Sequence, residues 1–92
     1  MSSTSFKGRT ILNMSWQSDA NSTTSGTVVI EFNGDVTGTP GFVTDATVNG
    51  VSVGGSSSPT YYASTDTTNF TLGSGGVSNP FTIGGTDTIT LV

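Results

Sequence analysis

Apolar and polar residues alternate in short runs along the chain, a pattern typical of β-strands that bury one face. The clearest run is 27–32, where Val28, Ile30 and Phe32 share the side that we expect to face a core. Apolar residues at helical spacing with helix-forming residues between them occur in no window of the sequence. The pattern therefore predicts an all-β fold.

A second run covers residues 10–16 and places Leu12, Met14 and Trp16 on one face. We interpret this run as a half-buried strand, with Trp16 contributing to the core. The alternation predicts further strands at residues 42–48, 51–53, 61–63, 69–72, 81–83 and 86–92. Polar or glycine-rich stretches separate these runs, as expected for the loops that join short strands.

The dipeptide Asn49-Gly50 lies between Val48 and Val51, with apolar residues alternating on both sides. Both central residues of a tight type I′ turn need positive φ, which glycine and asparagine adopt at low cost. We therefore predict a β-hairpin at this point. Residues 73–76, Gly-Ser-Gly-Gly, interrupt the run at 69–72 and are interpreted as a hairpin loop or a bulge.

About seven short strands with frequent turn signals predict a small antiparallel β-sandwich or barrel. We expect a single domain over residues 10–92, preceded by an extended, Ser/Thr-rich N-terminal arm over residues 1–9. A polar arm of this kind has little reason to become ordered alone, so we expect a neighbouring subunit, another partner or crystal packing to hold it.

Composition supports a folded domain with a thin core. The chain has 92 residues, of which 32% are hydrophobic, and 13 further residues are glycine. Ser and Thr together make up about a third of the sequence, and threonine favours pleated, half-buried surfaces. Small domains with thin cores often gain stability by docking or by forming oligomers.

The charge balance argues against two classes of partner. Lys and Arg number 2, Asp and Glu number 6, and the net charge is −4. Binding to nucleic acid or to an anionic membrane surface requires several cationic contacts, which Lys7 and Arg9 alone do not supply. We expect neither nucleic acid nor membrane as a partner.

Catalytic chemistry also finds little support. The chain has no His and no Cys, so it has neither the usual zinc ligands nor the Ser-His-Asp and Cys-His arrangements. The carboxylates stand singly in the sequence, whereas a glycosidase needs two that face one cleft. We predict no enzyme activity, no cofactor and no metal site. Loop calcium at residues 19–21 or 33–35 remains the weaker alternative to ordinary turn capping.

The residues that we expect to contact a partner fall into two groups. Aromatic residues with a polar tip are enriched at interfaces, and one of two adjacent tyrosines in a strand must point outward. The arm supplies polar residues, one apolar anchor and both cations of the chain. The predicted contact residues are Ser2, Ser3, Thr4, Ser5, Phe6, Lys7 and Arg9 in the arm, and Tyr61 and Tyr62 in the strand.

The arm, the cysteine-free Ser/Thr/Gly-rich strands and the final residues 85–92, Gly-Thr-Asp-Thr-Ile-Thr-Leu-Val, resemble small all-β virion proteins of tailed bacteriophages. The likeness is to head decoration, or cement, proteins and extends over the whole chain as one of size and texture. It implies a structural protein of the virion that binds the major capsid protein, often as a trimer, and stabilises the expanded head shell. It also implies that Ser2–Arg9 would contact the capsid.

Two other functions are compatible with the same residues. A tail-fibre or carbohydrate-binding β module would use Tyr61, Tyr62 or Trp16 as a stacking platform. An ice-binding surface would need a flat, regular threonine array, which the irregular Thr-x-Thr spacing disfavours.

Overall fold

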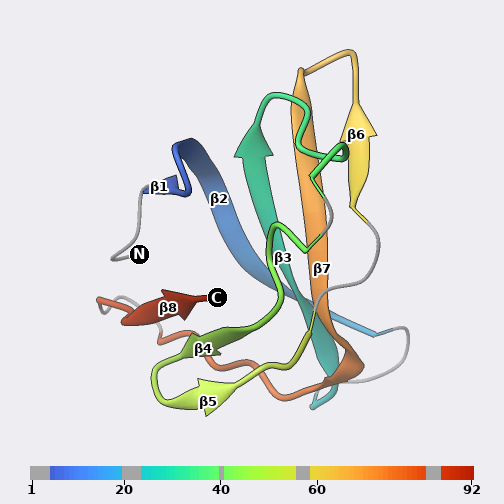
Figure 1. Ribbon diagram of the computed structural model, residues 1–92. Coiled ribbons are helices and arrows are strands. Elements are labelled where there is room, and N and C mark those ends of the chain that lie inside the picture. Colours follow the sequence, from blue (N-terminus) through green and yellow to red (C-terminus); the bar gives the residue numbers. More distant parts are fainter. Residues whose placement is uncertain (1–4, 20–23, 40, 56–58, 83–85) are drawn as a thin grey trace.

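The computed structural model describes residues 5–19, 24–39, 41–55, 59–82 and 86–92, which form strands and turns but no helix (Figure 1). All strand pairs are antiparallel. The strands are β1 (Ser5–Phe6), β2 (Arg9–Ser18), β3 (Gly26–Asn33), β4 (Ala46–Val48), β5 (Val51–Ser52), β6 (Thr60–Tyr62), β7 (Thr67–Val77) and β8 (Ile89–Leu91). The all-β prediction is confirmed, with eight strands rather than about seven.

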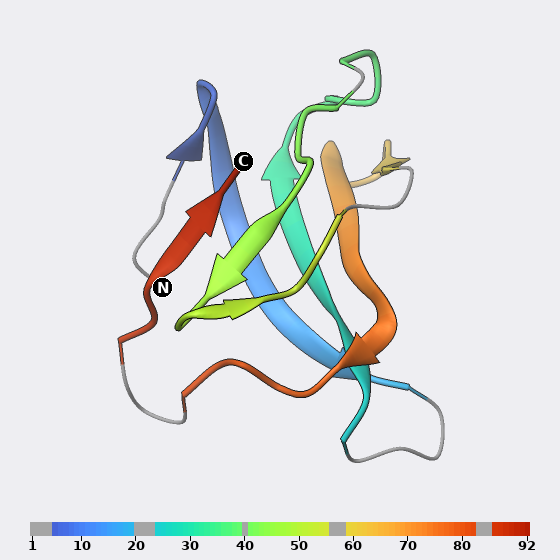
Figure 2. The same cartoon turned by 60° about the horizontal axis from the view of Figure 1, so that its bottom comes forward.

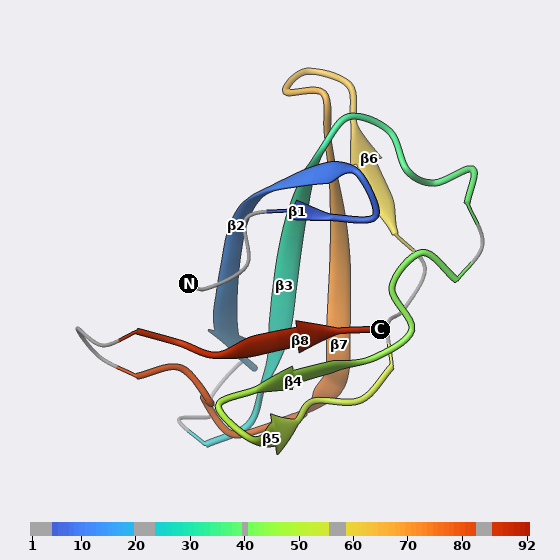
Figure 3. The same cartoon turned by 60° about the vertical axis from the view of Figure 1, so that its left-hand side comes forward.

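The strands form two sheets that pack as a sandwich. A five-stranded sheet has the order β1-β2-β3-β7-β6, and a three-stranded sheet has the order β5-β4-β8. The small sheet lies across one face of the large one, its strands crossing β2, β3 and β7 (Figures 2 and 3). The two-layer arrangement decides between the sandwich and the barrel in favour of the sandwich.

Strand β3 is the centre of the core, as the sequence predicted. Val28, Ile30 and Phe32 are fully buried, while the residues between them are half-buried. The Phe32 ring makes edge-to-face contacts with Phe42 at 5.2 Å and with Phe70 at 5.5 Å between ring centroids. Aromatic pairs prefer this geometry, so the phenylalanines join β3, β7 and the segment before β4.

Thr68, on β7, hydrogen-bonds to the turn through which the chain leaves β3. Its buried hydroxyl donates to the Gly34 carbonyl at 2.6 Å and accepts from the Val36 amide at 3.1 Å. The Gly34 amide in turn donates to the Asp66 carbonyl at 2.7 Å, and Gly34 has φ of 83°. One side chain thus satisfies backbone groups that leave the sheet at this turn.

The predicted hairpin at Asn49-Gly50 is confirmed. Strands β4 and β5 pair through Thr47 with Ser52 and Val48 with Val51. Asn49 has φ of 50° and Gly50 has φ of 80°, as a type I′ turn requires.

Three predicted strands differ in the structure. In β2, the pairing register shifts between Ile11 and Asn13, so Ile11 is buried and Leu12 is 47% exposed instead of facing the core. This bulge adds one residue and reverses the side on which the earlier residues lie. Beyond it, Met14 and Trp16 pack against the core as predicted.

The strand predicted at 42–48 begins only at Ala46, because Phe42 and Val43 are both buried and therefore do not alternate. The strand predicted at 81–83 is also wrong for its described residues. The Phe81 amide bonds to the Asn79 side chain at 3.0 Å, and Thr82 bonds to Asp87, so neither residue joins a ladder. Ile83 lies outside the described residues.

Strand β7 continues through the glycine-rich segment that was expected to interrupt it. Val28 pairs with Leu72, whereas Gly26 pairs with Val77, so β7 has four residues opposite one of β3. The segment is therefore a bulge, one of the two forms predicted. The indole Nε1 of Trp16 donates to the Val77 carbonyl at 2.8 Å and ties β2 to the end of this bulge.

Candidate interaction surface

Residues 5–9, which we expected to belong to an extended arm over residues 1–9, form a hairpin at the edge of the large sheet. Ser5 pairs with Thr10 and Phe6 with Arg9, so β1 and the start of β2 form a hairpin. The turn residues Lys7 and Gly8 have φ of 51° and 81°, the values of a type I′ turn. The physical reason is that this turn returns the chain onto itself and lets an apolar anchor reach the core. Ser2, Ser3 and Thr4 lie outside the described residues.

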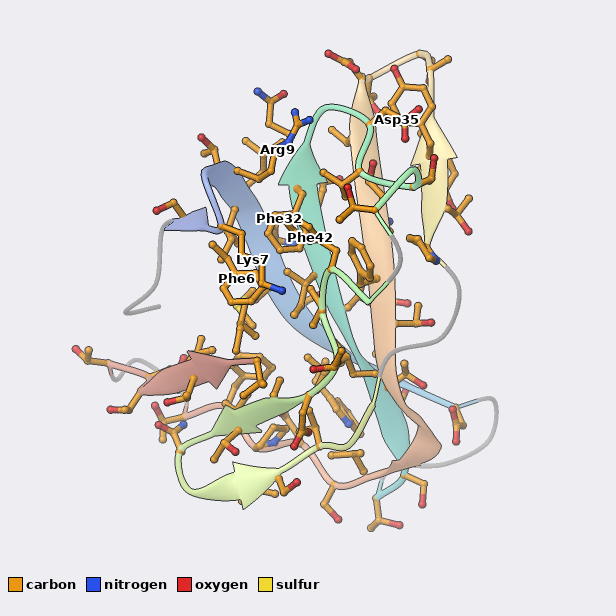
Figure 4. All side chains as sticks on the ribbon, viewed as in Figure 1. Phe6, Lys7, Arg9, Phe32, Asp35 and Phe42 are labelled. Carbon is orange, nitrogen blue, oxygen red and sulfur yellow. The ribbon has the colours of Figure 1, made fainter. Side chains whose placement is uncertain are left out.

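Two side chains of the hairpin, Phe6 and Lys7, contact Phe42 in the segment before β4. The half-buried Phe6 ring meets Phe42 edge to face at 5.7 Å between centroids (Figure 4). The Lys7 ammonium donates to the Phe42 carbonyl at 3.0 Å and lies 5.0 Å and 5.6 Å from the Phe6 and Phe42 ring centroids. Two predicted partner contacts, Phe6 and Lys7, are therefore engaged within the chain.

Arg9 lies at the other side of this hairpin, beside the turn that follows β3 (Figure 4). A Cβ added to Gly34 would lie 2.8 Å from Nη1 of Arg9, so the Arg9 guanidinium packs against the backbone at Gly34. Hydrogen bonds from the Thr37 hydroxyl and amide lower the pKa of Asp35, and the charge of Arg9 adds to this effect. Asp35 thus caps the turn through Thr37, which is the role that the sequence analysis favoured over a calcium ligand.

The two predicted tyrosines lie on β6, at the opposite edge of the large sheet from the hairpin. Tyr62 is 47% exposed, and Tyr61 is half-buried. The Tyr61 hydroxyl donates to Asp66 Oδ1 at 2.6 Å, and this bond raises the pKa of the phenol because ionisation would lose it. The outward residue of the pair is Tyr62, and its exposed ring makes it the better contact candidate.

A partly buried polar network at the Asn49 turn was missed from the sequence. Asn49 Nδ2 donates to the Pro80 carbonyl at 2.9 Å and to Asp87 Oδ1 at 2.8 Å. Thr82 donates to the same Asp87 oxygen through its amide at 3.0 Å and its hydroxyl at 2.9 Å. The Thr88 amide donates to Asn49 Oδ1 at 2.9 Å. We call these five residues the turn network.

The turn network links the β4–β5 turn, the segment around Thr82 and the start of β8 through hydrogen bonds. The Thr82 amide, followed by the Asn49 side chain, lowers the pKa of Asp87, so this carboxylate stays ionised. A general acid needs the opposite shift. Among the described residues, no three Asp or Glu side chains gather where they could hold a metal ion. No helix formed by these residues is long and apolar enough to cross a membrane.

The strands at the sheet edges are the most open part of the fold. In the part of the chain that the structure describes, the edges are β1 and β6 in the large sheet and β5 and β8 in the small one. None of these four strands contains a charged residue or a proline. Val51 on β5 and Tyr62 on β6 are each nearly half exposed. Open edges of this kind can accept a further strand.

Sequence reasoning placed β6 at an edge but missed the β1–β2 hairpin. The signal in the sequence was weak, because four residues separate Phe6 from Ile11 and only Gly8 among them favours positive φ. Comparisons of the chain with protein-family models, with curated proteins and with solved structures found no match.

Proposed function

We propose that this chain is a structural protein of a virion, a capsid decoration or cement protein that binds the head shell of a tailed bacteriophage. The observation that carries the proposal is the uncharged, proline-free state of the edge strands β1, β5, β6 and β8. Monomeric β proteins protect their edges with charges, prolines, bulges or very short edge strands, and of these devices the four edge strands have only their shortness. A protein that is permanently bound to its neighbours can leave its edges without charges or prolines, because the neighbours cover them.

The resemblance to decoration proteins supplies the partner, which is the major capsid protein of the shell. Such a protein is located in the virion, which is assembled in the host cytoplasm. Its role requires neither enzyme activity nor a cofactor. The trimer implied by the resemblance remains a prediction.

Binding to isolated shells tests the proposal. The purified protein should co-sediment with expanded head shells of its phage and raise the temperature at which they come apart. A variant lacking residues 1–4 tests the arm, because those residues can be removed without cutting into the β1–β2 hairpin. The proposal is lost if the full chain binds neither expanded nor unexpanded shells.

Charge placed on the open edges sharpens the same test. Val51→Lys on β5 and Tyr62→Lys on β6 should each weaken shell binding if that edge is used, because a buried unpaired ammonium is costly. Thr39→Lys, at an exposed loop position outside the four edge strands, is the matched control and should bind normally. If neither edge variant differs from this control, β5 and β6 are not the contact.

A carbohydrate-binding module is the second candidate, favoured by the exposed Tyr62 ring on an uncharged edge. A sugar stacked on this ring should quench or shift its fluorescence, and Tyr62→Ala should abolish the effect. Tyr61→Ala is the comparison, since the Tyr61 hydroxyl is already bonded to Asp66. A glycan array without binding would eliminate this candidate.

A further inference from the structure

Two Asn-Gly dipeptides lie at turns of the described structure, Asn33-Gly34 after β3 and Asn49-Gly50 between β4 and β5. Asparagine is a thermolabile residue, because its side chain can lose ammonia in water. A following glycine favours this reaction, since it has no Cβ to shield its amide nitrogen. Each of these turns is therefore a site of spontaneous modification unless the fold prevents it.

The reaction joins groups of adjacent residues. At Asn49, the Gly50 amide nitrogen gives its proton to hydroxide and attacks Cγ of Asn49. The Cγ–Nδ2 bond breaks, and Nδ2 takes a proton from water and leaves as ammonia. Water then opens either carbonyl–nitrogen bond of the resulting succinimide ring, which gives aspartate or isoaspartate. The net change consumes water, releases ammonia and needs no oxidant or reductant.

The turn network holds the Asn49 side chain at both of its polar atoms. Nδ2 donates to the Pro80 carbonyl at 2.9 Å and to Asp87 Oδ1 at 2.8 Å, and Oδ1 accepts from the Thr88 amide at 2.9 Å. Ring closure makes Cγ tetrahedral and moves both atoms away from these partners. Nδ2 also needs a proton in order to leave, but the Pro80 carbonyl and the ionised Asp87 only accept hydrogen bonds. The turn network thus opposes the reaction in the folded domain.

Asn33 is protected in a different way. Its side chain is exposed, whereas that of Asn49 is half-buried. The Gly34 amide, however, donates to the Asp66 carbonyl at 2.7 Å, and a nitrogen bonded in this way loses its hydrogen less readily. The fold thus holds the group that is attacked at Asn49 and the attacking group at Asn33. Because the two protections are separate, Asn33 serves as an internal reference for Asn49.

Neither product at position 49 fits the turn network. An aspartate places a carboxylate oxygen, in place of Nδ2, against Asp87 Oδ1 and the Pro80 carbonyl, which are both acceptors. Two carboxylates at hydrogen-bond distance repel each other strongly. An isoaspartate adds a backbone carbon to a tight turn in which Asn49 and Gly50 have φ of 50° and 80°. The longer backbone no longer matches the pairing of Val48 with Val51.

We propose that Asn49 is a site of spontaneous deamidation that the turn network blocks in the folded domain, and that its reaction prevents the small sheet from forming again. Local opening of the β4–β5 turn releases the Asn49 side chain from its partners. The extent of modification therefore increases with the time that this turn spends open. The inference goes beyond the proposed function and does not depend on capsid binding.

Incubation of the full chain in mildly alkaline buffer, both folded and in guanidinium chloride, gives the first test. Chymotrypsin cleavage after Phe32, Phe42 and Tyr61 places the two asparagines on separate peptides, in which mass spectrometry measures the conversion of amide to acid. In guanidinium chloride both sites should react at similar rates. In the folded chain, Asn49 should react at least about tenfold more slowly than in guanidinium chloride, because the reaction then requires the open turn.

Removal of a partner of Asn49 gives the second test. In the folded chain, Asp87→Ala should raise the deamidation rate at Asn49 several-fold and leave the rate at Asn33 unchanged. Asp19→Ala, which removes a carboxylate outside the turn network, is the matched control and should change neither rate. If Asp87→Ala does not fold, Thr82→Val takes its place, because it removes only the hydroxyl bond to Asp87. It should likewise accelerate the reaction at Asn49 alone.

Asn49→Asp introduces one of the two products directly. Its unfolding midpoint should lie below that of wild type, and its hydrogen exchange should be faster in β4, β5 and β8. Addition of Asp87→Asn to this variant should recover part of the loss, because amide and carboxylate then exchange places across the same hydrogen bond.

Several results would overturn the inference. They are a rate at Asn49 that is equal in the folded chain and in guanidinium chloride, a rate that stays unchanged in the folded variant of Asp87 or Thr82, and an Asn49→Asp variant as stable as wild type. A chain that fails to bind head shells but shows the expected rates would instead count against the proposed function alone.

Discussion

Different interactions stabilise each of the two sheets of this sandwich. The large sheet presents a row of fully buried apolar side chains, including Ile30, Phe32 and Leu72, to the interior. The small sheet has strands of only two or three residues and is tied at one end by the turn network. Where strands are too short to bury much apolar area, hydrogen bonds from side chains fix their position instead.

This difference teaches which residues control which part of the fold. Removal of a buried aromatic ring affects the whole domain, because β3 contributes to every layer of the core. Removal of a hydrogen bond in the turn network affects first the segments that it joins, which are the β4–β5 turn, the residues before Thr82 and the start of β8. The following predictions test this division, beginning with the largest effect.

Phe32→Ala should be the most damaging substitution. The ring is fully buried and contacts Phe42 and Phe70. Loss of a buried phenylalanine ring costs about 3–5 kcal/mol of unfolding free energy, a large share of what a small domain has. Denaturant unfolding measures this loss, and Val51→Ala at an exposed site of the small sheet is the control. Similar losses in the two variants would contradict the comparison.

Asn49→Gly should have a smaller and more local effect. Glycine keeps the positive φ of the turn but removes the bonds to Pro80, Asp87 and Thr88. The expected cost is about 1–3 kcal/mol, because Asp87 and a backbone carbonyl lose a buried partner. Hydrogen exchange should accelerate in β4, β5 and β8 before it does in β3. Uniform acceleration in both sheets would show that the turn network is not local.

Asp87 should make the small sheet sensitive to acid. Its pKa is lowered in the folded state, so its contribution to stability is present above the pKa of the unfolded chain, near 4, and is lost as pH falls through the folded value. Wild type should therefore lose stability between about pH 5 and pH 2. Asp87→Asn should lose less over the same range. Some decline persists in this variant, because the pKa of Asp35 is also lowered.

Tyr61→Phe should have the smallest effect of the four. Its hydrogen bond to Asp66 lies at the surface, where water can replace the lost partner. We expect an unfolding midpoint close to that of wild type, measured beside Asn49→Gly under the same conditions. A loss as large as that of Asn49→Gly would mean that burial does not distinguish the two hydrogen-bonded sites.

The parts of the fold that could be predicted from the sequence are those set by local chemistry. Alternation in 27–32 identified the core face of β3, and Asn49-Gly50 identified a hairpin, because positive φ restricts the residues that can form such a turn. The bulge at Leu12 could not be predicted, since it depends on pairing with a distant strand. The role of Thr68 was hidden for a similar reason: its hydroxyl serves backbone groups some thirty residues earlier.

The candidate surface was predicted less well than the fold. Phe6 and Lys7 were chosen as members of the arm that was expected to contact a partner, yet both contact Phe42 of the same chain. Strand parity predicted that one of Tyr61 and Tyr62 points outward, and Tyr62 is the exposed one.

The placement of the two cations has a practical consequence for proteolysis. Lys7 and Arg9 are the only residues after which trypsin cleaves, and both belong to the hairpin formed by β1 and the start of β2. Cleavage requires local opening of that hairpin, including release of the Lys7 ammonium from Phe42. Trypsin digestion therefore reports how often this one corner opens, and everything from Thr10 onward remains a single fragment whatever the rest of the domain does.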